Sequence, residues 1–207
     1  MSKNTSSLIY VWDPYCGWCY GFSKSIQALH ENHPELPLTI LSGGLFTGDR
    51  KKPISTMSYI EESNKRITDI TGAKFGEKYQ DLIDEGSFIM DSDMAAKGFS
   101  TLRFFAPERA YYLASAMSQA FYNEGKSLSD PNTYREIAIA NNLNPDDVVS
   151  RFESEISTKD ANSDFIKTRE LGVHSYPTLI LKKDDKFIEL GVGDMNLERL
   201  EKKLKSI

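Results

Sequence analysis

The only two cysteines of the chain, Cys16 and Cys19, lie two residues apart in the run DPYCGWCYG at residues 13–21. A chain of 207 residues, 40% of them hydrophobic, buries a sizeable core without disulfide staples. A bridge across two intervening residues also closes too small a loop to constrain the unfolded chain much. The pair is therefore expected to serve chemistry, either as half of a metal site or as a redox centre.

The residues around the cysteines predict a strand–helix–strand unit. Residues 8–12, LIYVW, form a continuous apolar run rich in β-formers, which is typical of a strand covered on both faces. After Cys16, apolar residues recur at helical spacing, which predicts one helix that ends before Pro34. These residues are Cys19, Phe22, Ile26 and Leu29. Residues 38–41, LTIL, predict a second strand and so complete a βαβ unit.

The rest of the chain divides into a helical block and a second set of strands. Helical periodicity and capping residues dominate from 55 to 155, whereas residues 176–181 and 187–190 predict an antiparallel hairpin before a last helix. We expect an α/β fold, ordered β-α-β and then α-β-β-α around a central mixed sheet. Residues 1–54 and 156–207 would form one domain in two halves, and residues 55–155 an inserted all-helical domain.

The metal interpretation depends on His30 and His33, which follow the cysteines. Their spacing is shorter than that of zinc fingers. If residues 17–32 are helical, His30 lies ~16 Å along the axis from Cys19, too far to share an ion. We therefore expect no metal site, and we expect both histidines to be polar residues at an exposed helix end.

The redox interpretation places Cys16 at the start of the helix and Cys19 one turn inside it. The N–H groups of a first helical turn stabilise a thiolate, and the thiolate is the nucleophile. Gly17 permits the tight entry, and Trp18 is either a docking surface or a core aromatic. The sequence leaves the roles of two charged residues undecided. Asp13 could relay protons for the cysteines or could simply form the turn before Pro14. Lys24 could assist the cysteines or could extend into solvent.

A second motif begins at Tyr176 and Pro177, where a proline opens a strand that is otherwise apolar. Proline removes a ladder hydrogen bond and is unusual in a buried strand. A cis Tyr176–Pro177 bond would turn residue 176 toward the cysteines. The alternative is an ordinary trans proline at the start of the strand.

Together these motifs resemble the thioredoxin superfamily. Cys16-Gly17-Trp18-Cys19 follows a first strand, and Tyr176-Pro177-Thr178 opens a late strand with a hairpin after it. The helical block resembles the DsbA-like branch, which includes disulfide oxidoreductases, FrnE-type cytoplasmic dithiol proteins and the kappa-class glutathione transferases. The run DPYCGWCYGF, with Ser42-Gly43-Gly44-Leu45, is most similar to bacterial DsbA-family proteins or disulfide isomerases.

The resemblance implies a thioredoxin-like fold and a role for each motif residue. Cys16 would attack, Cys19 would resolve the mixed disulfide, and Pro177 would be the cis proline. The backbone of Tyr176 would pair with an extended substrate. The substrate-binding residues would be Gly17, Trp18, Tyr176 and Thr178.

The expected activity is thiol–disulfide exchange by a protein-disulfide oxidoreductase or isomerase. Its partners would be protein thiols or glutathione as a co-substrate, with no cofactor besides the redox-active disulfide. Two alternatives are a glutathione-dependent transferase or isomerase of the kappa type, and a peptide-binding chaperone that uses a groove near Trp18, Phe46 and Tyr176.

Charge and hydropathy restrict the partners and the compartment. A net charge of −5 argues against nucleic acid as the main partner. No apolar run approaches the ~18–20 residues that span a bilayer, and the first residues do not read as a signal peptide. We expect a cytoplasmic protein, or a periplasmic one if a signal segment has been removed.

Overall fold

The computed structural model describes residues 6–207, which form an α/β fold around a four-stranded mixed sheet in the order β2-β1-β3-β4. The strands are β1 (Ser6–Trp12), β2 (Leu38–Ser42), β3 (Thr178–Lys183) and β4 (Lys186–Val192). β1 is parallel to β2 and antiparallel to β3, and β3 and β4 form the predicted hairpin. Tyr10 pairs with Leu179, so the two ends of the chain share one sheet, as predicted.

Both faces of the sheet are buried, which explains the unbroken apolar run in β1. On one face Leu8, Tyr10 and Trp12 join the main core of the molecule. On the other face Val11 packs in a smaller cluster with Leu41, Val173 and Ile180. Because side chains alternate along a strand, a strand between two apolar layers must be apolar at every position.

Four helices flank the sheet: α1 (Gly17–Gly21), α2 (Ser23–Asn32), α9 (Glu155–Glu170) and α10 (Leu197–Lys205). α9 packs against β2, whereas α10 packs against α2 and β4. His33 at the end of α2 joins these elements, because its Nε2 lies 3.0 Å from Oε2 of Glu201 on α10.

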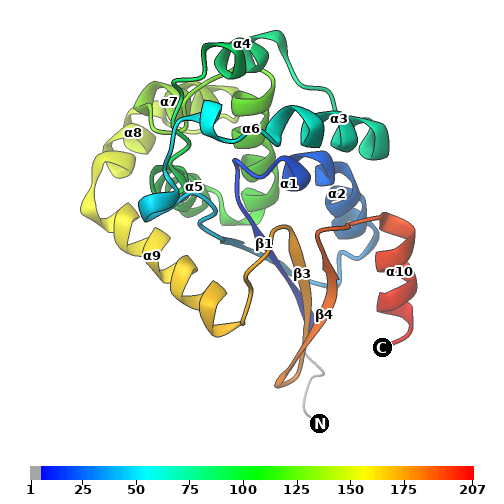
Figure 1. Cartoon of the computed structure of the whole chain (residues 1–207). Coiled ribbons are helices and arrows are strands. Elements are labelled where there is room, and N and C mark those ends of the chain that lie inside the picture. Colours follow the sequence, from blue (N-terminus) through cyan, green and yellow to red (C-terminus); the bar gives the residue numbers. More distant parts are fainter. Residues whose placement is uncertain (1–5) are drawn as a thin grey trace.

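The inserted block between β2 and α9 is helical, as predicted. Its helices are α3 (Ile60–Thr71), α4 (Glu77–Glu85), α5 (Ser92–Phe105), α6 (Ala110–Tyr122), α7 (Pro131–Ala140) and α8 (Pro145–Glu153). Asp130 and Asn144 cap α7 and α8, each followed by proline in the first turn. Figure 1 shows this block gathered around the end of β1 where α1 begins. The boundaries of 55–155 stay a prediction.

The helix predicted after Cys16 is not continuous, and this expectation was wrong. α1 ends at Gly21, and Phe22, whose N–H donates to Trp18 O, separates it from α2. A Cβ at Gly21 would lie 2.6 Å from Cγ2 of Ile67 on α3. The missing side chain of Gly21 lets α1 lie directly against α3 of the inserted block. The buried residues of α2, Ile26 and Leu29, pack in the same core as Leu8 and Tyr10 of β1.

The sheet and the inserted block share one hydrophobic core around the cysteine motif. Trp12 at the end of β1 packs edge-on against Phe99 of α5, with ring centroids 5.5 Å apart. Tyr15 packs in the same way against Phe121 of α6, at 4.7 Å. The segment that leads into Cys16 is thus held by aromatic contacts to two helices of the inserted block.

Candidate functional site

Cys16 is the N-cap residue of α1, and its sulfur caps the helix. Its backbone is extended, with φ −84° and ψ 108°. The backbone N–H of Cys19 donates to Cys16 Sγ at 3.3 Å, and the N–H of Cys16 donates to Asp13 O at 3.0 Å. The turn Asp13–Cys16 therefore aims the sulfur of Cys16 across the mouth of the helix.

Cys19 lies one helical turn further on and is more enclosed. Both cysteines are free thiols, with Cys16 6% exposed and Cys19 3% exposed. Burial raises the pKa of Cys19 well above that of an ordinary thiol, and the neighbouring Cys16 adds to the increase. Burial raises the pKa of Tyr10 of β1 well above that of an ordinary tyrosine, and the neighbouring Cys19 adds to the increase. At neutral pH Cys19 is therefore a protonated thiol inside the core.

Tyr176 and Pro177 lie opposite Cys16, although they are far away in the sequence. The Tyr176–Pro177 peptide bond is cis. The Cys16 thiol donates to the carbonyl oxygen of Tyr176 at 3.5 Å, and the Tyr176 hydroxyl donates to Gly43 O at 2.5 Å. The fold therefore brings together the cysteine motif, the Tyr176–Pro177 segment and the Gly43–Gly44 turn after β2.

The other residues expected at the site take different positions. Gly17 packs closely on α3, because a Cβ there would lie 2.9 Å from Cδ1 of Ile67. Trp18 is half-buried and stacks on Phe22, with ring centroids 6.0 Å apart. Thr178 is buried, and its hydroxyl donates to Ser175 O at 2.7 Å. Its side chain does not line the wall around Cys16, so the substrate-binding role of Thr178 stays a prediction.

A groove of about 260 Å³ opens beside Cys16, between the cysteine motif and the inserted block. Trp18, Phe46 and Tyr176, the three residues expected to form a groove, all line it. Its other wall is the face of α3 that carries Ile60, Ser63, Asn64 and Ile67. The groove is thus half sheet domain and half insertion, which no local sequence pattern indicates.

The buried carboxylate of Asp13 connects the cysteine loop to the segment after β2. Asp13 is 1% exposed, and burial raises the pKa of its carboxyl group even though several hydrogen bonds lower it. One oxygen accepts from Tyr15 N at 3.0 Å, which is the predicted turn. The other accepts from Leu45 N at 2.8 Å. Asp13 therefore fastens the cysteine loop to a residue that lines the groove.

The remaining polar candidates have other environments. Lys24 is exposed to solvent. The ring of His30 packs near Tyr111, and His33 pairs with glutamates. Within residues 6–207, no group of three or more His, Cys, Asp or Glu side chains could hold a metal ion. In the same residues, no helix has both the length and the apolar character needed to cross a bilayer.

Comparison with known proteins agrees with this geometry. Residues 8–205 match the DSBA-like thioredoxin domain family. The chain belongs to the DSBA-like thioredoxin domain family. It is therefore a thioredoxin-like protein whose sheet is interrupted by an inserted helical block. No curated protein matched the sequence.

Solved structures with the same fold include two bacterial proteins of the same size. A candidate protein disulfide isomerase from Nitrosomonas europaea is 20% identical, with a TM-score of 0.85 over 98% of this chain and 97% of that one. The cytosolic disulfide reductase DsbM from Pseudomonas aeruginosa is 23% identical, with a TM-score of 0.80 over 97% and 100%. A second DsbM structure contains glutathione; it is 21% identical, with a TM-score of 0.78 over 97% and 98%.

Proposed function

We propose that the chain exchanges thiols and disulfides through the Cys16–Cys19 pair, with Cys16 as the nucleophile and Cys19 as the resolving thiol. One observation carries the assignment. Cys16 Sγ borders the groove, lies 3.5 Å from Tyr176 O and accepts the N–H of Cys19. Cys19 does not line the groove and is nearly inaccessible. An incoming disulfide therefore meets Cys16 first.

The exchange follows in two balanced steps. The Cys16 thiolate attacks one sulfur of a substrate disulfide, forms a mixed disulfide and releases one substrate thiolate. The Cys19 thiolate then attacks Cys16 Sγ, closes the Cys16–Cys19 disulfide and releases the second thiolate. Two electrons pass from the dithiol to the substrate, and the protons of both cysteines go to the two released thiolates. The reverse sequence oxidises a dithiol.

The Tyr176–Pro177 segment is the proposed docking edge for the substrate. The Tyr176 carbonyl points to Cys16 rather than into a strand ladder, since β3 begins only at Thr178. A substrate in extended conformation would hydrogen-bond to this exposed backbone and place its sulfur near Cys16. Gly17 and Trp18 form the adjoining surface.

Protein thiols and glutathione are the proposed substrates, in the cytoplasm. The cytosolic location of DsbM and its structure with glutathione support this choice. The dipeptide Gly17-Trp18 brings no positive charge to the Cys16 sulfur. We therefore propose a weaker oxidant than the periplasmic enzymes of the family, acting as a reductase or isomerase.

The test is turnover in an insulin-reduction assay with the two single serine variants. Cys16→Ser should abolish activity, whereas Cys19→Ser should accumulate mixed disulfides visible by mass spectrometry. Lys24→Gln is the matched control on α2 and should retain full activity. Undiminished activity of Cys16→Ser would refute the proposal. Glutathione binding and transferase activity that survive loss of both cysteines would favour the kappa-type alternative.

A further inference from the structure

The groove beside Cys16 has no charge of its own. No Asp, Glu, Lys, Arg or His side chain lines it, and most of the lining side chains are aromatic or aliphatic. A carboxylate placed on this surface would lose hydration without gaining an oppositely charged partner. The selectivity of the site for charged substrates must therefore come from groups at the rim.

Arg66 is one such group, on the α3 side of the groove. Its guanidinium carbon lies 5.8 Å from the centre of the Trp18 ring. Its neighbours Ser63, Asn64 and Ile67 on α3 all line the groove. The side chain is exposed, and within residues 6–207 it forms no ion pair. Arg66 therefore places a cation without a carboxylate partner against the ring of Trp18, the residue that precedes Cys19.

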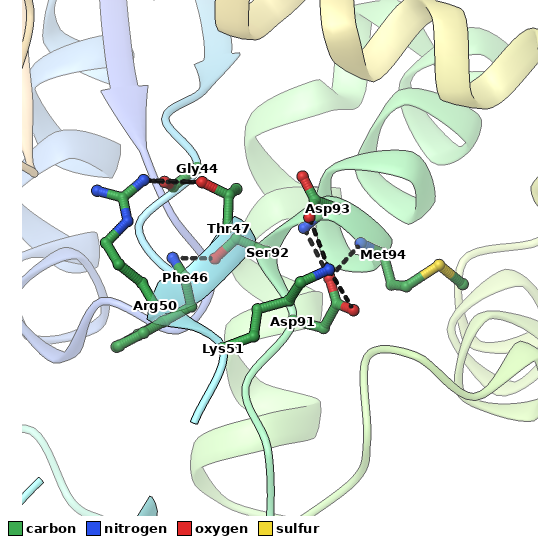
Figure 2. Close-up of polar contacts among 9 residues, drawn as sticks. All are labelled: Gly44, Phe46, Thr47, Arg50, Lys51, Asp91, Ser92, Asp93 and Met94. Carbon is green, nitrogen blue, oxygen red and sulfur yellow. Dashed lines mark hydrogen bonds and ion pairs between the residues drawn. The ribbon is translucent and has the colours of Figure 1, made fainter. Parts of the chain in front are cut away.

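Arg50 is a second cation, on the opposite side near the Gly43–Gly44 turn. Its Nη2 donates to Gly44 O and to Thr47 Oγ1, both at 2.8 Å and both neutral oxygens. Figure 2 shows the contrast with the adjacent Lys51, whose ammonium lies 3.2 Å from Asp91 and 2.8 Å from Asp93. In the described part of the chain Arg50 therefore forms no ion pair, whereas Lys51 pairs with two carboxylates.

Arg50 and Tyr176 bind neighbouring residues of the turn after β2, so the charge of Arg50 lies near Tyr176. Gly44, which Arg50 binds, lies between Gly43, the acceptor of the Tyr176 hydroxyl, and Leu45, which lines the groove. Burial and Asp13 raise the pKa of Tyr176, and the positive charge of Arg50 lowers it. The field of Arg50 thus reaches the residue opposite Cys16.

We propose that Arg50 and Arg66 bind the carboxylates of a small anionic disulfide whose sulfurs lie at Cys16. This inference rests on the proposed function and names its preferred substrate class. A groove of about 260 Å³ accommodates a small ligand rather than a folded protein surface. The planar guanidinium fork matches a carboxylate. One fork beside Trp18 and a second beside Gly44 suit a peptide-like thiol with a carboxylate at each end.

The reaction is the exchange described above, carried out as a single turnover. The reduced Cys16–Cys19 dithiol gives two electrons to the disulfide, which leaves as two thiols, while the enzyme ends with the Cys16–Cys19 disulfide. The arginines take no part in bond making. They bind substrate and act on its affinity and orientation.

The experiment compares three disulfides of different charge with the pre-reduced full chain. The probes are glutathione disulfide (anionic), hydroxyethyl disulfide (neutral) and cystamine (cationic), and the second-order rate of enzyme oxidation is measured. We expect the anionic probe to react fastest. Arg50→Gln and Arg66→Gln should each slow it about 10-fold, which corresponds to the loss of one charge-assisted hydrogen bond. The neutral probe should change less than about two-fold.

Each arginine has a matched control on its own segment. Lys52→Gln and Lys65→Gln each remove one positive charge from an exposed neighbour with no partner in residues 6–207. Neither should change the preference for the anionic probe. Raising the salt concentration should reduce that preference in the wild type and leave the double variant Arg50→Gln/Arg66→Gln unaffected.

The outcomes separate this inference from the proposed function. Equal rates for all three probes, or an equal loss on all three in the arginine variants, would overturn the arginine assignment and leave the dithiol mechanism standing. No reaction with any of the three disulfides would overturn the dithiol mechanism itself. If the lysine controls lost the preference for glutathione disulfide as strongly as the arginine variants, the preference would depend only on the net charge of the protein. That result would also overturn the assignment of Arg50 and Arg66.

Discussion

The ring of Tyr176 packs directly on Gly43 and leaves no room for a side chain there. A Cβ added at position 43 would lie 2.2 Å from Cε1 of Tyr176. The hydroxyl of the same ring donates to the carbonyl oxygen of Gly43. The turn after β2 and the segment before β3 therefore determine each other's position. Since Tyr176 also accepts from Cys16 through its carbonyl oxygen, this contact extends to the reactive sulfur.

Replacing Gly43 should disturb the site through this contact. Gly43→Ala should displace Tyr176, lower the free energy of unfolding by about 1–3 kcal/mol and reduce turnover at least about 10-fold. Urea unfolding and the insulin assay measure the two effects. Gly72→Ala is the control: Gly72 has φ 71° and open space around it. It should cost about 1 kcal/mol and leave turnover unchanged.

The same contact predicts coupling between the two positions. In a Tyr176→Ala background the clash is absent, so adding Gly43→Ala should cost little more stability. A double-mutant cycle would then give a coupling free energy of about 1 kcal/mol or more. If the two substitutions lowered the free energy of unfolding additively, the Tyr176 ring would move aside freely in Gly43→Ala, and the predicted coupling would be wrong.

A buried ion pair holds the other end of the same turn. Asp164 on α9 is 2% exposed, binds Arg103 of α5 through both oxygens at 2.9 and 3.0 Å, and accepts from Ser42 N at 3.1 Å. Asp164→Asn would leave Arg103 without its counter-charge and should lower the free energy of unfolding by about 3 kcal/mol. Turnover should fall as well, because Ser42 leads into Gly43.

The control for this prediction is an exposed pair of the same kind. Arg199 and Asp194 form an ion pair with side chains 79% and 47% exposed. Arg199→Gln should change the free energy of unfolding by no more than about 0.5 kcal/mol. Equal effects of both substitutions in urea titrations would show that the buried pair adds no stability.

The resolving step should depend strongly on pH. Burial and the neighbouring Cys16 raise the pKa of Cys19, so its thiolate fraction at neutral pH is below that of an ordinary thiol and grows as the pH rises. A mixed disulfide of Cys16 with thionitrobenzoate should therefore release its aromatic thiol about 10-fold faster per pH unit, from about pH 6 to about pH 9.

A matched variant tests the cause of that dependence. Cys19→Ser should show only the slow release caused by external thiols, with no such pH profile. A flat profile in the wild type would contradict burial as the factor that controls Cys19. A profile that levels off below the pKa of an ordinary thiol would also contradict it, because Cys19 would then lose its proton more easily than burial allows.

The sequence by itself determined the local structure of this protein. The continuous apolar run of residues 8–12 predicted a strand covered on both faces. The pairs Asp130-Pro131 and Asn144-Pro145 are typical of helix starts, because a cap depends on neighbours in the chain. The cysteine spacing indicated a redox centre, and the resemblance indicated the family. The fold class and the pairing of the two chain ends followed from these features.

Only the tertiary structure decided what lies around Cys16. The break between α1 and α2, the link from Asp13 to Leu45, the α3 wall of the groove and the free charges of Arg50 and Arg66 join segments distant in the chain. Thr178 does not line the groove, and its hydroxyl donates to Ser175 O. Burial, desolvation and charge pairing depend on packing in three dimensions, and no local pattern in one sequence encodes them.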